Sequence, residues 1–234
     1  MLRTLIFYLL FYPWTLFVIL TGVPLSYIRA DYLHNYARTW GKIGLLLAGV
    51  RLTIHGKENL AGLGPVIYMG NHQSNFDILA LFAGLPGQFR WIAKEELFRI
   101  PLFGYSMKRC GYIPINRTDR RKALLSMRSA AERISSGTSV VIFPEGTRSE
   151  DGNLLPFKKG GFSLAQQAGV PIIPLAINGS RSINPKGRLR IFGGHIELTI
   201  FPPIASEGSV EGVMEAVRTS IEQVLTPSAS PEAS

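Results

Sequence analysis

The sequence contains a single cysteine among its 234 residues, and Asp, Glu, Lys and Arg together make up only 18% of it. One cysteine excludes an internal disulfide, so cysteine usage gives no sign of an oxidising compartment. Cys110 stands between Arg109 and Gly111 ahead of an apolar run, which favours a buried structural thiol over a nucleophile. Zinc-finger spacing, a basic-region helix and an aromatic RNA-binding motif are all missing, so nucleic acid is a poor candidate for a partner.

The charge that is present is mostly positive. The formal net charge is +9 at pH 7, while hydrophobic residues make up 46% of the chain. A positive balance attracts anionic partners, such as an acidic membrane face or an acidic carrier substrate. The hydrophobic share exceeds what a soluble domain usually needs, so we expect part of the surface to meet lipid. Together these features favour a membrane over nucleic acid.

One long hydrophobic run lies near the beginning of the chain. Residues 5–28 carry no charge and are flanked by Arg3 and Arg29, and about 20 apolar residues are enough to span a bilayer. Pro13 and Pro24 are expected to kink or end a straight helix. A signal peptide is the alternative, but the run is long and no small-residue cleavage site follows it.

A second and weaker apolar segment covers residues 32–50 and is flanked by basic residues. It is short and interrupted, which makes a second full span less favoured. We therefore predict that residues 1–50 form a kinked helical pair that dips into one leaflet of a membrane. A single full span by the first segment is the alternative.

Beyond residue 51 the sequence changes to short apolar runs that alternate with amphipathic stretches. The expected strands are 66–69, 89–93, 112–115, 139–143, 172–177, 189–192 and 196–201. The expected helices are 76–85, 102–108, 119–136, 161–167 and 210–225. This alternation predicts an α/β fold, with a mostly parallel sheet flanked by helices. We assign residues 51–225 to one domain and the Pro/Ser/Ala-rich residues 226–234 to a disordered tail.

The most informative segment reads Asn71-His-Gln-Ser-Asn-Phe-Asp77, between an expected strand and an expected helix. In a helix, five residues turn by about 500°, so His72 and Asp77 would point apart if both were helical. They can meet if His72 precedes the helix, with Asn71 or Ser74 capping it. Asp77 would then hold one imidazole nitrogen and leave the other to take a proton from a substrate hydroxyl.

No serine or cysteine is arranged as a nucleophile, because the Gly-x-Ser-x-Gly pattern is missing. A His–Asp pair without an enzyme nucleophile suits direct attack by the alcohol of an acceptor substrate. We therefore predict that His72 acts as a general base and that Asp77 orients it.

A second cluster follows the expected strand at 139–143 and reads Pro-Glu-Gly-Thr-Arg from residue 144. Gly146 allows backbone amides to approach a ligand closely, and Arg148 suits bidentate binding of phosphate. Glu145 could orient Arg148 or hydrogen-bond the acceptor. Arg117, at the end of another apolar run, could complete a phosphate clamp. The apolar segment 170–177, with its two prolines, is expected to be a core strand without a chemical role.

Four segments, 71–77, 111–117, 143–149 and 170–174, resemble in order the motif blocks of the glycerolipid acyltransferase family. The resemblance implies that His72 is the general base and Asp77 its partner. It also implies that the last block shapes the site or an acyl pocket, and that Lys94 helps to hold phosphate. The residues implied to bind the glycerol phosphate of a lysophospholipid are Arg117, Glu145, Gly146, Thr147 and Arg148.

The resemblance further implies an enzyme that moves a fatty acyl chain from acyl-CoA or acyl carrier protein to the sn-2 hydroxyl of lysophosphatidic acid, giving phosphatidic acid. No metal or cofactor is expected. Both carriers are cytoplasmic, so the enzyme should lie at the inner membrane with its catalytic domain facing the cytoplasm. Pro114 and Asn116 depart from the family pattern, which keeps lyso-ornithine lipid or another lysophospholipid as an alternative acceptor. A lipid hydrolase and a catalytically silent lipid-binding protein are the rival functions.

Overall fold

A computed structural model describes residues 1–116 and 120–225 of the chain, apart from the side chains of residues 120 and 122. The predicted tail, the first residue of the helix expected at 119–136 and the predicted phosphate ligand Arg117 lie outside the described residues. The helices are α1 (Leu2–Ser26), α2 (Ala30–Ala48), η1 (Lys57–Leu60), α3 (Phe76–Gly84), η2 (Glu95–Arg99), α4 (Phe103–Arg109), α5 (Arg120–Ser135), α6 (Lys159–Ala168), α7 (Ser180–Ile183) and α8 (Val210–Glu222). The strands are β1 (Val50–His55), β2 (Ile67–Gly70), β3 (Arg90–Lys94), β4 (Ile113–Ile115), β5 (Val140–Ile142), β6 (Ile172–Asn178) and β7 (Gly194–Ile200).

These strands form one sheet in the order β1-β7-β6-β2-β5-β3-β4. Every neighbouring pair is parallel except β6 and β7, which are antiparallel. The predicted α/β fold with a mostly parallel sheet flanked by helices is therefore confirmed. Because the parallel strands β2, β5, β3 and β4 run in one direction, the loops after them meet at one edge of the sheet.

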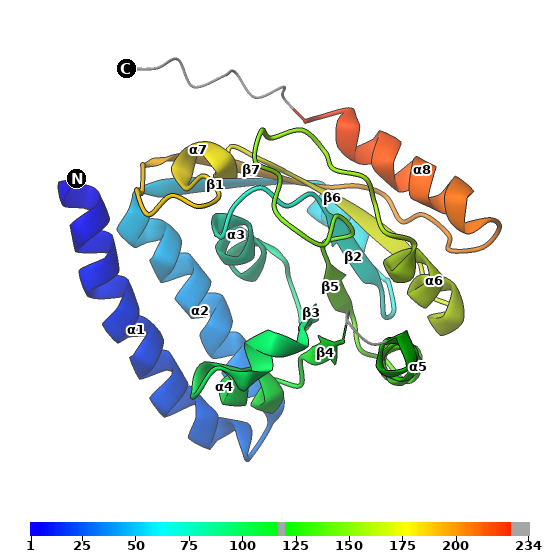
Figure 1. Cartoon of the computed structure of the whole chain (residues 1–234), viewed down its shortest axis with the longest axis horizontal. Helices are drawn as coiled ribbons and strands as arrows, with labels where there is room; N and C mark the ends of the chain where they lie inside the picture. The colour runs from blue at the N-terminus through cyan, green and yellow to red at the C-terminus, as the bar shows by residue number, and fades with distance from the viewer. Residues whose placement is uncertain (117–119, 226–234) are drawn as a thin grey trace.

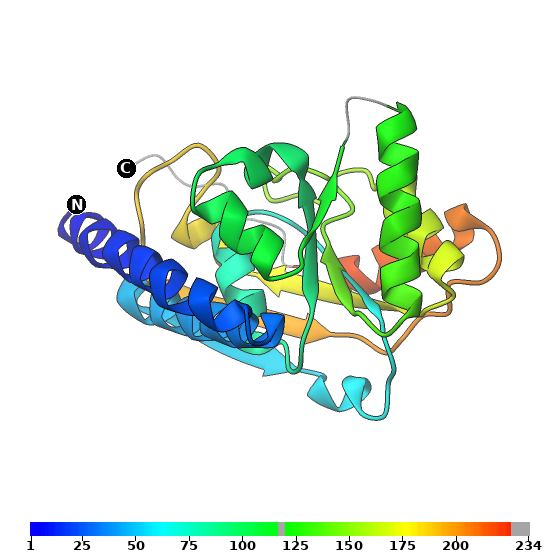
Figure 2. The same cartoon turned by 90° about the horizontal axis from the view of Figure 1, so that it is seen from below.

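Two hydrophobic cores cover the two faces of the sheet. Alternate residues of a strand point to opposite faces, and in β2 Tyr68 joins the core beneath α1, α2 and α3, while Ile67 and Met69 join the core beneath α5, α6 and α8. Figures 1 and 2 show α1 and α2 side by side along one side of the molecule, with α5, α6 and α8 at the other. Burial on both faces explains why the central strands read as continuous apolar runs.

The N-terminal helical pair is present, and both ends of α1 are fastened to the rest of the chain. Near its beginning, the Thr4 hydroxyl accepts a hydrogen bond from the Ile191 backbone N–H at 3.0 Å. At its end, the Arg109 guanidinium donates to the backbone carbonyl of Ser26 at 2.9 Å and to its hydroxyl at 3.0 Å. The helix therefore lies along the domain surface over its whole length.

Two details of the sequence prediction were wrong. Residues 189–192 do not form a strand, because the buried Asn184 amide donates to the carbonyls of Arg188 and Arg190 and curls this segment into a loop. The strand β1 was missed, and it pairs in parallel with β7 from Val50 to His55. Its alternation of Leu52 and Ile54 with polar residues is the period-two signal of a half-buried strand.

Close packing of α2 on α3 depends on Gly41. A Cβ at this position would lie 2.8 Å from both the Leu79 carbonyl oxygen and the Phe82 Cβ. We expect Gly41→Val to lower the free energy of unfolding by about 1–3 kcal/mol, since overpacked cores must shift to accommodate the added atoms. Thermal unfolding in detergent measures this. Gly64→Val is the matched control, because nothing lies within 4 Å of a Cβ added at that position, and an equal loss there would contradict the packing argument.

Candidate active site

The loop between β2 and α3 is held in place by a buried asparagine. Asn71 is 1% exposed, and its amide group donates to the Ile177 carbonyl at 2.9 Å and accepts from the Ile177 N–H at 2.7 Å. This pair of bonds ties the end of β2 to β6. The N-cap residue of α3 is Asn75, so neither predicted cap, Asn71 or Ser74, holds that position. The Ser74 hydroxyl, one residue earlier, accepts from the Phe76 N–H at 3.2 Å.

The predicted meeting of His72 and Asp77 is present in the structure. Because α3 begins at Phe76, His72 precedes the helix, and its Nδ1 lies 2.8 Å from Asp77 Oδ2. The same oxygen accepts the backbone N–H groups of Gln73 at 2.7 Å and Ser74 at 2.8 Å. Asp77 is fully buried. A buried carboxylate with these donors fixes both the loop and the orientation of the imidazole.

The remaining edge of the His72 ring faces a cavity. Nδ1 faces the Asp77 carboxylate, which can only accept, and no residue in the described part of the chain hydrogen-bonds Nε2. The ring stacks on Phe143 with centroids 3.9 Å apart and planes 4° from parallel. The His72 side chain is 14% exposed. The arrangement therefore presents a rigid and accessible imidazole nitrogen, and the role of His72 as a base remains a prediction.

Glu145 organises the backbone around this histidine. It is 2% exposed, and its two oxygens accept the His72 N–H at 2.6 Å and the Leu155 N–H at 2.9 Å. Burial raises the pKa of Glu145 to about 7, against the opposing effect of these two hydrogen bonds. Both oxygens are thus committed to backbone groups, and the contact of Glu145 with an acceptor lipid stays a prediction.

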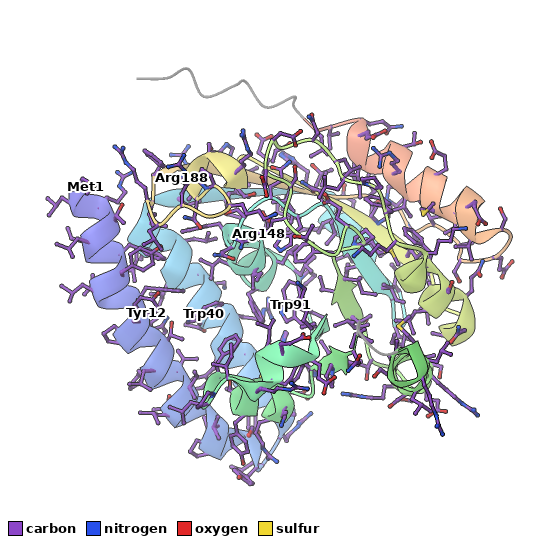
Figure 3. All side chains as sticks on the ribbon, in the orientation of Figure 1. Met1, Tyr12, Trp40, Trp91, Arg148 and Arg188 are labelled. Carbon is purple, nitrogen blue, oxygen red and sulfur yellow. The ribbon has the colours of Figure 1, made fainter. Side chains whose placement is uncertain are left out.

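The other predicted substrate ligands lie around the same loop. Gly146, with a φ of 74° that favours glycine, lines the cavity. Thr147 is exposed and Arg148 half-buried, and in the view of Figure 3 Arg148 lies between Arg188 and Trp91. Lys94, at the end of β3, also lines the cavity. The roles of these side chains in binding remain predictions.

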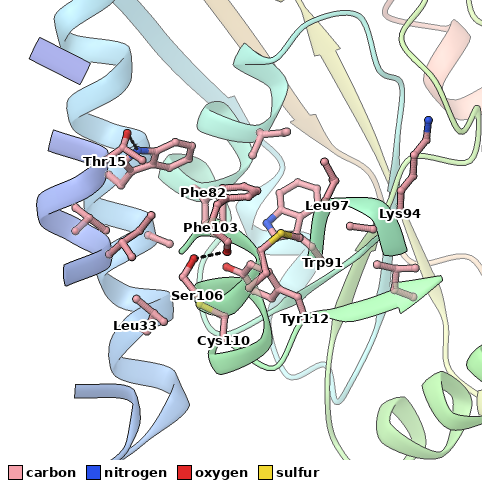
Figure 4. A pocket seen from close by; sticks show the side chains of 18 of the residues that line it. Thr15, Leu33, Phe82, Trp91, Lys94, Leu97, Phe103, Ser106, Cys110 and Tyr112 are labelled. Carbon is pink, nitrogen blue, oxygen red and sulfur yellow. Dashed lines mark hydrogen bonds between the residues drawn. The ribbon is translucent and has the colours of Figure 1, made fainter. Parts of the chain in front are cut away.

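Sequence reasoning missed the cavity itself, which has a volume of about 300 Å³. It lies between α1, α2, α3, β3 and α4, with His72, Phe143 and Gly146 among its lining residues. Figure 4 shows side chains from several of these elements pointing into it. Its apolar wall includes Val18, Ile19, Leu33, Ala37, Phe82 and Met107. An apolar cavity with a histidine in its lining suits a substrate with a long hydrocarbon chain.

Cys110 and the segment 170–174 match the chemistry expected of them from the residues alone. Cys110 is 4% exposed, and burial raises the pKa of its thiol to about 11, which makes it an unreactive structural residue. Ile172 and Ile173 are fully buried in β6 and do not line the cavity. Among residues 1–116 and 120–225, no group of three or more His, Cys, Asp or Glu side chains could hold a metal ion.

The chain belongs to the acyltransferase family, whose sequence model matches residues 51–178. It is 36% identical over 193 residues to the chloroplastic 1-acyl-sn-glycerol-3-phosphate acyltransferase BAT2 of Brassica napus, an alignment that covers 80% of this chain and 56% of that protein. It is 32% identical over 200 residues to the human 1-acyl-sn-glycerol-3-phosphate acyltransferase alpha, covering 83% and 70%. The chain spans about half the length of its relatives from Brassica napus, Chlamydomonas reinhardtii and Arabidopsis thaliana.

A solved structure shares the architecture. The crystal structure of the 1-acyl-sn-glycerophosphate (LPA) acyltransferase, PlsC, from Thermotoga maritima superposes with a TM-score of 0.77 at 27% sequence identity. The match covers 95% of this chain and 96% of that one, so it includes the N-terminal helices.

The buried Glu145 carboxyl predicts a pH-dependent stability. Its folded-state pKa of about 7 lies above the ordinary value of 4.5, so the folded state binds the extra proton, and stability must fall as the pH rises between these values. The slope is about 1.4 kcal/mol per pH unit at most. We expect Glu145→Gln to remove this slope, whatever it does to the overall stability. Denaturant unfolding between pH 4.5 and pH 7 tests this, and an unchanged slope in the variant would contradict the assignment.

Proposed function

We propose that this chain is a 1-acyl-sn-glycerol-3-phosphate acyltransferase. It transfers a fatty acyl chain from acyl-CoA or acyl carrier protein to the sn-2 hydroxyl of lysophosphatidic acid and forms phosphatidic acid. The observation that carries this proposal is the accessible Nε2 of His72, oriented by buried Asp77 at the end of an apolar cavity. The relatives from Brassica napus, human and Thermotoga maritima are named for the same substrate, which supports the proposal.

The mechanism needs only one proton acceptor. His72 Nε2 removes the proton from the sn-2 hydroxyl as that oxygen attacks the thioester carbonyl carbon. Asp77 stabilises the imidazolium that forms. When the tetrahedral intermediate collapses, the carbon–sulfur bond breaks, and the leaving thiolate takes the proton from Nε2. The N–H of Gly146 already donates to the Phe143 carbonyl at 3.0 Å, so donors for the oxyanion must come from other groups.

We assign the phosphate of the acceptor to Arg148, which follows the cavity-lining Gly146 by two residues, as its principal ligand, with Lys94 of the cavity lining as a second cationic group. A charge-assisted hydrogen bond contributes about 1.5–3 kcal/mol. Arg148→Met should therefore raise the KM for lysophosphatidic acid about tenfold or more and leave the KM for the acyl donor little changed. Arg128→Met, on the exposed face of α5, is the control. Equal effects of both variants would contradict the assignment.

We assign the acyl chain to the apolar cavity. Leu33, on α2, lines it together with Cys110 and Tyr112 on the opposite wall (Figure 4). Leu33→Phe adds volume inside the cavity, so the rate with long-chain donors should fall relative to the rate with short-chain donors. Competition between two thioesters of different length measures this ratio. A ratio equal to that of the unchanged protein would show that the chain binds elsewhere.

We place α1 in one leaflet of the membrane, with the catalytic residues on the cytoplasmic side. It is long and apolar enough to cross a bilayer, and only 17% of its most apolar stretch is buried. Two contacts oppose a crossing, however, because Thr4 and Ser26, near the opposite ends of the helix, both bond to the same domain. A helix fastened at both ends lies along the lipid surface with its exposed face in the hydrocarbon.

Acyl transfer by detergent-purified protein tests the proposed function. Lysophosphatidic acid and lyso-ornithine lipid are offered in parallel, each with acyl-CoA and with acyl carrier protein thioesters. We expect phosphatidic acid from lysophosphatidic acid and none from His72→Ala. Product from lyso-ornithine lipid alone would change the acceptor and keep the chemistry. Free fatty acid without acceptor would indicate a hydrolase, and no product at all would favour a silent lipid-binding protein.

A further inference from the structure

The segment between α7 and β7, residues 184–193, is an ordered loop that we call the 184–193 loop. The Phe192 N–H donates to the Ile183 carbonyl at 2.9 Å and closes the base of the loop. Inside it, the Asn184 amide, 3% exposed, donates to the carbonyls of Arg188 and Arg190 at 2.8 and 3.2 Å. These bonds give the loop a fixed shape, so its exposed side chains are presented in fixed positions.

What the loop presents is apolar and cationic. Leu189 is 78% exposed and Phe192 40% exposed, while Ile191 between them is buried. Arg188 and Arg190 are exposed, and the Arg190 guanidinium lies 4.7 Å from the centroid of the Phe192 ring. In the described part of the chain, neither arginine forms an ion pair with an acidic residue. Uncovered leucine and unneutralised arginine suit a surface with negative charge above hydrocarbon.

The same loop is continuous with the exposed apolar face of α1. The Tyr8 hydroxyl donates to the Leu189 carbonyl at 2.9 Å, and the Ile191 N–H donates to the Thr4 hydroxyl. On the outer side of that helix, Leu5 and Leu9 are 65% and 67% exposed. Figure 3 shows Arg188 on the same side of the molecule as Met1 at the beginning of α1. Helix and loop thus form one surface with hydrocarbon side chains and a cationic border.

We propose that the 184–193 loop is a second lipid-docking element, in which Leu189 enters an anionic membrane surface and Arg188 and Arg190 bind its phosphate headgroups. This inference rests on the proposed location of α1 at the membrane. We assign a lipid surface rather than a soluble anion to this loop, because a soluble anion would not require an exposed leucine between the two arginines. A lipid surface satisfies both parts of the loop at once.

Docking of this loop also orients the catalytic residues. The Lys186 ammonium donates to the Arg148 carbonyl at 3.1 Å, and the Ser74 hydroxyl donates to the Asn184 carbonyl at 2.8 Å. The loop therefore contacts both the segment that carries Arg148 and the beginning of α3. Lipid bound at Arg188 and Arg190 places the catalytic residues next to the surface from which the acceptor lipid comes.

Site-specific fluorescence quenching tests the proposal in the full-length protein. Cys110 is buried, so unchanged protein gives the background for labelling with a thiol-reactive fluorophore. Leu189→Cys is labelled and bound to vesicles of phosphatidylcholine and phosphatidylglycerol in about equal amounts, with brominated acyl chains. Leu9→Cys on α1 reports docking of the whole protein. Glu58→Cys, on η1 at the far edge of the molecule (Figure 2, cyan, bottom), is the control.

We expect the bromolipid to quench the labels at positions 9 and 189 and not the label at position 58. Replacing phosphatidylglycerol with phosphatidylcholine, or introducing Arg188→Gln with Arg190→Gln, should lower quenching at position 189 about twofold or more. Quenching at position 9 without quenching at position 189 would overturn the proposal while leaving α1 in the membrane. If quenching at position 189 changed neither with the lipid charge nor with replacement of the two arginines, the assignment of an anionic ligand would be wrong.

Discussion

The carboxylate of Asp77 is the constraint on which the site depends. A buried carboxylate is costly unless it is hydrogen-bonded, and here Oδ2 collects the imidazole N–H of His72 and two backbone N–H groups, whereas the buried Oδ1 has no partner in the described part of the chain. Those donors come from the loop that leaves β2, and the carboxylate comes from the first turn of α3. The requirement to satisfy one charge therefore fixes the angle between strand, loop and helix. The position of the histidine relative to the cavity follows from that geometry.

A second buried carboxylate extends this organisation across the sheet. Glu145, after β5, bonds to the N–H of His72, after β2, so that the loops following two neighbouring parallel strands hold each other. The Ser149 N–H in turn donates to the His72 carbonyl at 2.8 Å. Phe143 from the same segment stacks on the imidazole. Arg148, which we assign to the acceptor phosphate, is thus attached to the same loop pair that carries the proposed base.

Much of this was predictable from local patterns. Runs of β-branched residues located the central strands, and the segment 71–77 could only place His72 and Asp77 together if the helix began after the histidine. The prediction of a strand at 189–192 was wrong, because the apolar residues there match a strand pattern. The backbone path of this segment is instead set by hydrogen bonds from a polar side chain before it, Asn184. The strand β1 was not predicted, because it directly follows the hydrophobic N-terminal helices. Its signal is nevertheless present, since Leu52 and Ile54 alternate with polar neighbours.

The cavity could not be predicted, since it exists only between elements that are remote in sequence. Val18 of α1, Leu33 of α2 and Met107 of α4 line it together, and no periodicity in one helix shows which other helix will face it. The structural role of Glu145 could not be predicted for the same reason. Its acidity and its position in the motif suggested contact with substrate, whereas its hydrogen bonds to backbone N–H groups appear only once β2 and β5 are neighbours.

The central claim is that Asp77 holds His72 in the tautomer and orientation of a general base. The most direct measurement is the kcat of Asp77→Asn for phosphatidic acid formation, with both substrates saturating and the fold verified by thermal unfolding. The asparagine keeps the shape of the side chain and removes its charge. Our account predicts that kcat falls by about 10³-fold or more, as expected when a buried carboxylate no longer orients a catalytic imidazole. A kcat within tenfold of the unchanged protein would contradict it.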